Sequence, residues 1–213
     1  MTEAAAACRP TVEARRQQIL DAACDCVRRS GFHGASMARI AETAGLSVGQ
    51  IYRYFENKEA IVAAIADQDL AEMHEKFAEL EASGESLAEA VIVHCSDGID
   101  RNYDPDRAAL LLEVLAEAAR NPRVATIVQE ADAKERMMGR RIMESAGLAG
   151  LGERELAARG EVLSMLFDGM VTRAIYNPGG DKAAISEVLR TVMRGLLSPG
   201  ALTGASPLAK AAN

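Results

Sequence analysis

The sequence is poor in aromatic residues and in other signs of β-structure. It has four Tyr, four Phe and no Trp among its 213 residues. Proteins built from many short strands usually contain more aromatic and β-branched residues than that. The abundant residues are instead strong helix formers such as Ala, Glu, Arg and Leu. The composition therefore predicts an all-α protein.

The sequence also lacks long apolar runs and an ordered set of cysteines. No apolar stretch approaches the ~20 residues that a membrane-spanning helix needs, and the N-terminal residues lack the charged-then-apolar pattern of a signal peptide. The four cysteines, Cys8, Cys24, Cys26 and Cys95, are too few and too irregularly spaced for a disulfide scaffold or a zinc site. We therefore expect a cytoplasmic protein with reduced thiols, no membrane contact, no metal and no cofactor.

Charge is distributed unevenly along the chain, whose formal net charge is −7. Residues 1–58 contain 8 Lys or Arg and 6 Asp or Glu, whereas residues 59–213 contain 16 and 25. The first part thus carries a net charge of +2 and the second −9. This asymmetry predicts two parts with different tasks.

Capping residues, Pro and Gly divide the chain into about nine expected helices. Asp104-Pro105 and Asn121-Pro122 each place a capping side chain before a proline at the first helical position, where the missing N–H does no harm. Gly31 is an expected stop for the first helix. The expected helices cover residues 11–30, 36–43, 47–54, 57–82, 86–101, 104–120, 121–145, 153–176 and 181–197.

The segment 36–55 has the pattern of a helix-turn-helix. Its first helix has one apolar stripe at three- and four-residue spacing, formed by Met37, Ile40, Ala41 and Ala44. Ile51 and Phe55 are the expected buried anchors of its second helix, and the turn at 44–47 sets the sharp angle between the two helices. The second helix is too short to be stable alone, so its neighbours must brace it.

The outward positions of this segment carry side chains that suit the major groove of DNA. The Gln50 amide can pair with adenine, Val48 can pack on a thymine methyl group, and Gly49 leaves room for the backbone to approach. Phosphate contacts are expected from Ser47, Tyr54 and Lys58, with positive charge added by Arg39 and Arg53. Short amphipathic helices with a glycine turn also occur in proteins that never touch DNA, so spacing alone leaves both interpretations open.

Residues 15–66 resemble the N-terminal domain of the TetR family of bacterial transcriptional regulators. The matching motifs are Ser-Met-Ala-Arg-Ile-Ala at 36–41, Ala-Gly-Leu-Ser-Val-Gly-Gln-Ile-Tyr-Arg-Tyr-Phe at 44–55 and Asn-Lys-Glu at 57–59. Ser36 departs from the Thr that is more frequent in the family but keeps the hydroxyl. The resemblance implies that the DNA-contacting positions are Val48, Gln50, Tyr52, Arg53, Tyr54 and Lys58.

The resemblance further implies a homodimeric regulator that binds a near-palindromic operator in double-stranded DNA and senses a small molecule through its C-terminal domain. We expect a DNA-binding helix-turn-helix domain over residues 1–56, a ligand-binding and dimerisation domain over 57–197 and a flexible tail over 198–213. The likeness weakens beyond about residue 70, where no motif identifies the effector.

Apolar residues cover so much of the two last helices that each needs partners on more than one side. An isologous dimer would supply them. The expected interface residues are Leu163, Phe167, Met170, Val188, Leu189 and Val192. The alternative is that these residues form the core of a monomer.

An effector pocket is expected among apolar and half-polar residues of the C-terminal part. Methionine suits irregular ligand walls, although it fills ordinary core gaps equally well. The expected pocket residues are His94, Leu111, Val114, Met138, Leu166 and Met170. The acids Glu113, Glu117 and Asp168 would suit a cationic effector, with solvent exposure as the alternative for Asp168.

The leading hypothesis from the sequence is a non-enzymatic transcriptional repressor that a small-molecule effector releases from DNA. One alternative is a DNA-binding regulator without a small-molecule effector. Another is an enzyme or small-molecule-binding protein whose helix-turn-helix is vestigial. An enclosed cavity in the C-terminal part would count against the first alternative.

Overall fold

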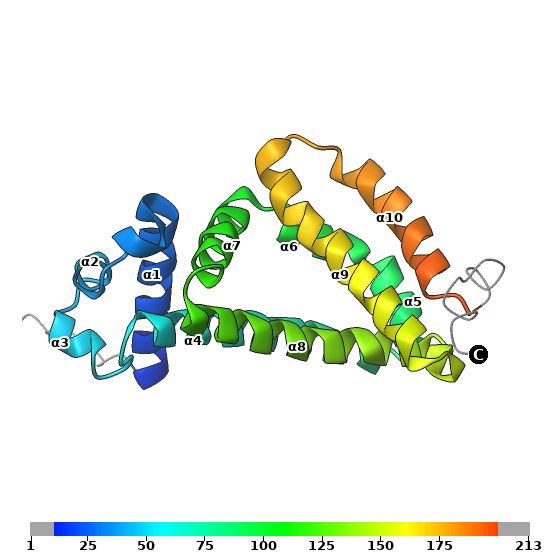
Figure 1. The fold of residues 1–213 in the computed structure, drawn as a ribbon, viewed down its shortest axis with the longest axis horizontal. Coiled ribbons are helices and arrows are strands. Elements are labelled where there is room, and N and C mark those ends of the chain that lie inside the picture. The colour runs from blue at the N-terminus through cyan, green and yellow to red at the C-terminus, as the bar shows by residue number, and fades with distance from the viewer. Residues whose placement is uncertain (1–10, 200–213) are drawn as a thin grey trace, which may run out of the picture. The chain divides into compact units, whose positions relative to one another are not determined.

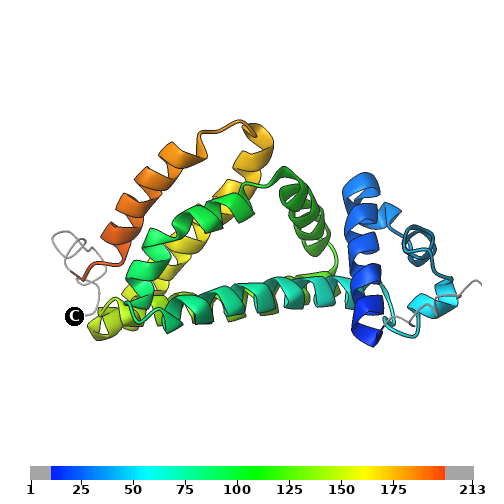
Figure 2. The same cartoon turned by 180° about the vertical axis from the view of Figure 1, so that it is seen from behind.

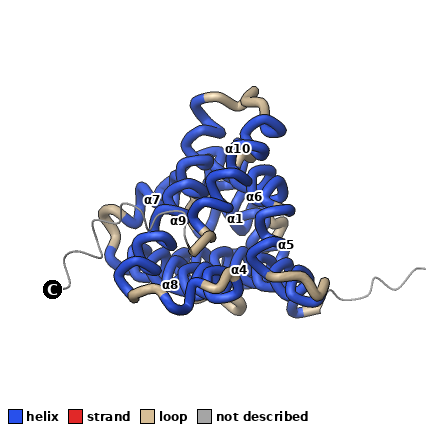
Figure 3. The backbone as a smooth tube through the Cα atoms, turned by 90° about the vertical axis from the view of Figure 1, so that its right-hand side faces the viewer, coloured by secondary structure: helices blue, strands red, loops and turns tan. Residues whose placement is uncertain are grey.

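A computed structural model describes residues 11–199, and every regular element in this range is a helix (Figure 3). The predicted all-α class is therefore confirmed. The helices, shown in Figure 1, are α1 (Val12–Gly34), α2 (Met37–Thr43), α3 (Val48–Ile51), α4 (Lys58–Ala82), α5 (Leu87–Val93), α6 (Cys95–Asn102), α7 (Pro105–Ala118), α8 (Pro122–Ser145), the short 3-10 helix η1 (Leu148–Gly150), α9 (Glu153–Tyr176) and α10 (Lys182–Leu196).

Helix starts follow the capping residues of the sequence. Asp104 accepts a hydrogen bond from the Arg107 N–H, and Asn121 from the Arg123 N–H, each before a proline at the start of its helix. Such caps satisfy backbone donors that have no partner inside the helix. The boundaries of α7 and α8 consequently lie within two residues of the expected ones.

Two helices differ from their expected form. The expected helix over 86–101 is broken at His94, whose backbone (φ −91°, ψ 16°) is not helical, so that α5 and α6 replace it. The expected helix over 47–54 is helical only over Val48–Ile51 and continues as tight turns to Phe55. The described part of the chain thus has ten α-helices rather than about nine.

The chain divides between residues 65 and 66 into two compact units. In the first unit, α1 packs on α2 and α2 packs on α3. Its core consists of side chains that are almost completely buried, including Ile19, Phe32, Ile40, Ala41, Ile51, Phe55 and Ile61. The predicted inward stripes of the helix-turn-helix therefore do form the core of this unit.

The second unit has one apolar core to which its helices contribute. Helix α7 packs on α8 and α9, α6 packs on α9, and α10 packs mainly on α6 and α5 (Figure 2). The core includes Leu87, Ile92, Ile99, Ile142, Leu148, Leu156, Val171, Ala174 and Met193. Ion pairs Lys134–Asp67 and Arg141–Glu81 connect α8 to α4, but both are exposed and stabilise little.

None of the described helices is long and apolar enough to cross a membrane. The expected tail over 198–213 lies outside the described residues except for its first two positions.

Candidate functional site

The recognition segment is held by the core beneath it and by a cap at its start. Ile51 is fully buried and Phe55 nearly so, which fixes the inner side of α3 and the turns after it. Ser47 accepts a hydrogen bond from the Gln50 N–H at 3.2 Å, and the Gln50 Oε1 accepts one from the Ser47 N–H at 2.8 Å. This reciprocal capping box satisfies two donors at the start of a helix of only four residues.

Most of the expected DNA-contacting side chains lie on the outer side of this segment. Tyr52 is 53% exposed and Val48 39% exposed. Tyr54 is half-buried. The other exposed positions among those expected are Arg39, Ser47, Gly49, Gln50 and Arg53.

The Gln50 amide is already engaged within the segment. Its oxygen is the acceptor of the capping box, which leaves the amide N–H₂ group as the donor that it presents outward. A bidentate pair with adenine uses both the oxygen and the nitrogen of the amide. The Gln50 oxygen has two lone pairs and the capping box uses one of them, so the other can still accept from adenine.

Lys58 lies differently from what the sequence led us to expect. Its Nζ donates a hydrogen bond to the Phe32 carbonyl oxygen at 2.5 Å and lies 3.9 Å from the centre of the Phe32 ring. In this conformation the ammonium group ties the start of α4 to the end of α1 instead of pointing outward to a phosphate. The sequence offered no local signal for this contact, because the two residues are 26 positions apart.

Arg16 is a positioning residue: the sequence suggests it as a contact to the DNA backbone, and the structure shows it bound within the unit. Its guanidinium donates to the Tyr54 carbonyl oxygen at 3.1 Å and stacks on the Phe55 ring, with Cζ 4.4 Å from the ring centre. Both partners belong to the turns that follow α3. Arg16 on α1 therefore braces the end of the recognition segment.

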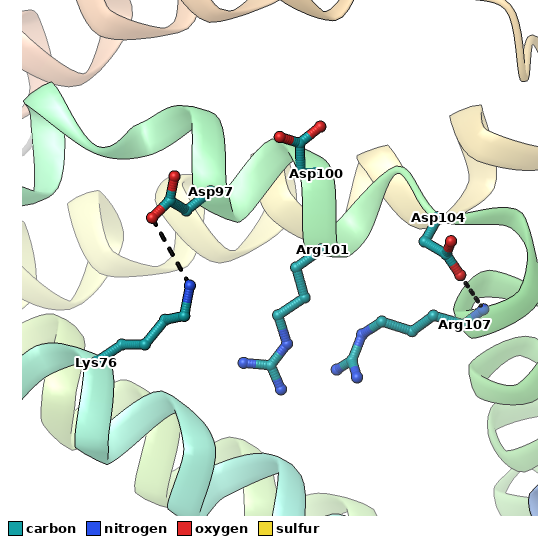
Figure 4. Close-up of a pocket in the computed structure, with 6 residues that line it drawn as sticks. All are labelled: Lys76, Asp97, Asp100, Arg101, Asp104 and Arg107. Atoms are coloured by element: carbon teal, nitrogen blue, oxygen red, sulfur yellow. Dashed lines mark hydrogen bonds and ion pairs between the residues drawn. The ribbon is translucent and has the colours of Figure 1, made fainter.

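A separate cavity of about 580 Å³ opens among α4, α6 and α7 in the second unit. It is wide open to solvent and lined only by charged side chains, whereas small-molecule sites are mostly concave and apolar. All six side chains that line it are charged (Figure 4): Lys76, Asp97, Asp100, Arg101, Asp104 and Arg107. None of the six pocket residues expected from the sequence lines this cavity.

Those expected pocket residues lie elsewhere in the second unit. Met138 and Met170 are buried, and Met170 belongs to the apolar core. Leu111 and Leu166 pack against that core, Val114 is half-buried, and His94 is exposed where α5 ends.

Two arginines of the cavity are drawn together by one carboxylate of α4. The Arg101 Nη2 donates to the Asp69 backbone oxygen at 3.1 Å and lies 3.2 Å from Asp69 Oδ1. The Arg107 Nη1 donates to the same Oδ1 at 2.7 Å. The Arg107 Nε is buried without a hydrogen-bond partner. Two cations thus share one carboxylate oxygen.

Two further carboxyl groups near these arginines have perturbed acidity. Desolvation raises the pKa of the Glu135 carboxyl, and the nearby negative charge of Asp168 raises it further. The positive charges of Arg101 and Arg107 offset part of this rise in pKa. Desolvation and Glu161 raise the pKa of Asp168. Among the described residues, no cluster has the make-up of a metal site.

The residues expected at a dimer interface divide into three groups. Met170 and Leu189 are buried in the core of the chain, where their side chains have no surface left for a second subunit. Leu163 and Phe167 are half-buried against the same core. Val188, at 65% exposed, and Val192 are open to solvent on α10.

Comparisons with known proteins match both units. Residues 19–65 match the family model of bacterial regulatory proteins of the tetR family, and residues 82–199 match that of the tetracyclin repressor-like C-terminal domain. The Escherichia coli K12 protein described as the HTH-type transcriptional regulator UidR is 32% identical over 117 residues, or 54% of this chain. The aligned part spans 57% of that relative's length.

Solved structures share the fold over most of the chain. GusR from Salmonella enterica superposes with a TM-score of 0.70 at 24% identity, covering 89% of this chain and 98% of that one. FadR from Bacillus subtilis, solved in complex with stearoyl-CoA, gives a TM-score of 0.70 at 21% identity, covering 83% of this chain and 96% of that one. At these identities the likeness establishes the arrangement of helices.

Proposed function

Because the chain belongs to the tetR family of bacterial regulatory proteins, we propose that it is a sequence-specific DNA-binding repressor, which a small-molecule effector releases from its operator. The observation that carries the proposal is the outer side of the recognition segment. There the buried Ile51, the capping box at the start of α3 and Arg16 hold the recognition segment in place. Its exposed side chains are of a size that fits the major groove of DNA.

In this proposal the outward side chains divide into readers and anchors. Val48 and the Gln50 amide face base edges, which carry the sequence information. Tyr52, Arg53, Tyr54 and the Ser47 hydroxyl contact phosphates and fix the register, with Arg39 adding charge from α2. Lys58 joins them only where DNA draws its ammonium away from the Phe32 carbonyl.

We propose a homodimer, because a near-palindromic operator needs two recognition segments about 34–36 Å apart. Exposed apolar residues on α9 and α10 support it. Val162, Met165 and Tyr176 recur on one face of α9, and Val188 and Val192 on one face of α10. Apolar surface of this kind marks interaction sites. We expect Val188→Glu to yield monomers in size-exclusion chromatography with light scattering, whereas the control Ala183→Glu stays dimeric.

FadR from Bacillus subtilis, which shares this fold, was solved in complex with stearoyl-CoA, and this supports an effector over a regulator without one. An effector that prefers a conformation with a different separation of the two recognition segments weakens operator binding. A coupling free energy of about 1–3 kcal/mol, or 5–150-fold in affinity, is typical of such regulation. As a DNA-binding protein of this kind, the chain would act in the cytoplasm.

The proposed function is tested by selecting duplexes from a random-sequence pool with the purified full chain. We expect a near-palindromic consensus, and an affinity for it at least about 10³-fold higher than for random DNA. Gln50→Ala should lower discrimination at one base pair per half-site by about 1–3 kcal/mol. Failure to enrich any sequence, with the chain folded and dimeric, would refute the proposal.

A further inference from the structure

We propose that Gln18 and Arg16 of α1 hold the chain just before and just after α3, and thereby help to determine which DNA sequence α3 reads without touching DNA themselves. We call these two side chains the α1 clamp. The inference rests on the proposed function, because specificity has meaning only for a chain that binds DNA. The hydrogen bonds of the clamp are features of the first unit alone.

Gln18 holds the turn that precedes α3. Its Nε2 donates a hydrogen bond to the Ala44 carbonyl oxygen at 2.6 Å, between residues that are 26 positions apart. Ala44 is the C-cap of α2, and carbonyl groups at the end of a helix lack a partner inside it. Gly45 follows with a φ of 64°, where the chain turns toward α3. The bond from Gln18 therefore fixes the turn that sets the angle between α2 and α3.

Arg15 orients the amide of Gln18. The Arg15 Nη1 donates to the Gln18 Oε1 at 2.8 Å from the preceding turn of the same helix. If the amide were turned over, its N–H₂ group would face the Arg15 guanidinium and its oxygen would face the Ala44 carbonyl oxygen. Both contacts would be repulsive, because each would join two donors or two acceptors. Arg15 thus keeps the donor of Gln18 directed at the turn.

Arg16 holds the chain after α3 by two contacts. Its guanidinium donates to the Tyr54 carbonyl oxygen at 3.1 Å, and its Cζ lies 4.4 Å from the centre of the Phe55 ring. The same combination occurs at Lys58, whose ammonium donates to the Phe32 carbonyl oxygen and lies over the Phe32 ring. The unit itself therefore shows that a lysine can make both kinds of contact.

The α1 clamp fixes what the buried anchors leave free. Helix α3 has only four residues, so it cannot hold its own direction. Ile51 and Phe55 bury apolar side chains beneath it, and apolar contact is not directional. Hydrogen bonds need a narrow range of distances and angles, so one at each end of α3 limits its rotation over these anchors. Contacts to base edges are hydrogen bonds of equally narrow geometry and therefore depend on this limit.

Specific and non-specific DNA binding should depend on the clamp to different degrees. Non-specific binding comes mainly from attraction to phosphate charge, which tolerates small displacements of α3. A phosphate contact from Arg16 would have a different signature, because it would strengthen binding to every sequence and increase the salt dependence. We assign positioning rather than phosphate contact, because Arg16 is half-buried and engaged by Tyr54 and Phe55.

The test measures the affinity of the full chain for its selected operator and for a random-sequence duplex, by fluorescence anisotropy at one salt concentration. Gln18→Met and Arg16→Met should each lower the ratio of the two affinities about fivefold or more, because the proposed dimer loses one net hydrogen bond in each subunit. Gln17→Met is the matched control and should keep the wild-type ratio, since the Gln17 amide donates within α1, to Asp21 at 2.9 Å. An unchanged ratio for folded Gln18→Met would overturn the proposal.

Two further measurements separate positioning by Arg16 from phosphate contact. The slope of log K against log salt on the random duplex should keep its wild-type value in Arg16→Met, whereas loss of a phosphate contact in both subunits would lower it by about 1.8. Arg16→Lys should restore most of the affinity ratio, because Lys58 shows that an ammonium group makes both contacts. A lower slope with an unchanged ratio would assign Arg16 to DNA and refute its place in the clamp.

The direction of α3 can also be followed without DNA. Residual dipolar couplings of the backbone N–H groups of the ¹⁵N-labelled full chain report the orientation of each helix. In Gln18→Met and Arg16→Met the couplings of residues 48–55 should no longer fit the wild-type orientation relative to α1, while those of α1 and α2 still agree with each other. Gln17→Met should keep every orientation. Wild-type couplings for residues 48–55 in both clamp variants would contradict the clamp.

Failure of this inference can be told apart from failure of the proposed function. If the wild-type chain selects no duplex, the repressor is refuted, and the dipolar couplings still decide whether the clamp directs α3. If the chain selects an operator and the two clamp variants keep the wild-type affinity ratio, the clamp is refuted and the repressor stands.

Discussion

Replacing Lys58 by Met separates a structural role of this residue from a DNA-contacting one. The Met side chain keeps much of the apolar stem and removes the ammonium, which donates to the Phe32 carbonyl at 2.5 Å and lies over the Phe32 ring. If this contact persists on DNA, Lys58 joins α1 to α4 and does not bind a phosphate. Its loss should then reduce stability and leave the salt dependence of DNA binding unchanged.

The expected loss of stability follows from the two contacts. A hydrogen bond from a charged donor contributes about 1.5–3 kcal/mol, and a cation–π contact at a solvated site about 0.5–1 kcal/mol. Because Lys58 is only half-buried, solvent screening lowers their sum, and we expect Lys58→Met to cost about 1–2 kcal/mol. With a urea m-value of about 2 kcal/mol/M, the midpoint of unfolding falls by about 0.5–1 M.

The assay pairs urea unfolding with fluorescence anisotropy on a random-sequence duplex at several salt concentrations. Each phosphate contact contributes about 0.9 to the slope of log K against log salt. Lys58→Met should keep the wild-type slope. Arg53→Met, on the exposed side of the recognition segment, should reduce the slope by about 1.8, because the proposed dimer loses one phosphate contact in each subunit, and should keep the wild-type stability. A lower slope for Lys58→Met with unchanged stability would show that our account of Lys58 is wrong.

Two further predictions concern the second unit. Arg159 is 3% exposed and binds Glu155 at 2.7 Å and the Leu196 carbonyl at 2.8 Å, so Arg159→Met should lower the free energy of unfolding by about 3–5 kcal/mol. Arg154→Met, exposed on the same helix, should change it by less than about 0.5 kcal/mol, and similar urea midpoints for both variants would contradict this account. Because desolvation raises the pKa of Glu135, its carboxyl holds a proton more tightly in the folded chain than in the unfolded chain. The free energy of unfolding therefore falls as pH rises above 4.5, the ordinary pKa of a glutamate. Glu135→Gln should therefore melt at a higher temperature than wild type at pH 7 and lose this advantage below pH 4.5, and an equal advantage at both pH values would refute it.

Local sequence was enough to predict the helices whose ends are decided by neighbouring residues. The Asp104 and Asn121 caps and the following prolines act within three residues, so the starts of α7 and α8 follow from them. The same holds for the buried stripe of α2, because helical periodicity is itself local. The break at His94 has no such signal, since neither Pro nor Gly stands at that position.

Residue roles that depend on distant partners were not predictable in this way. The sequence around Lys58 predicts that its side chain is exposed. Only the fold brings the Phe32 carbonyl oxygen within hydrogen-bond distance of its ammonium group. Met170 and Leu189 show the same limit, because an apolar stripe does not distinguish a core from a subunit interface. The stripe predicts that a side chain is covered but not by which surface.

The cavity arginines show most clearly what a single segment conceals. Along the chain, Arg101 and Arg107 stand in a stretch of alternating charges, where each has an acid beside it and neither is conspicuous. In the fold they meet at Asp69, which lies 32 and 38 residues earlier and offers both of them one carboxylate oxygen. The donor left over, the Arg107 Nε, is closed to solvent, and so is the unpartnered Arg190 Nε of α10. Because the shared partner stands on another helix, neither the charge pattern of residues 100–107 nor helical spacing predicts the pair.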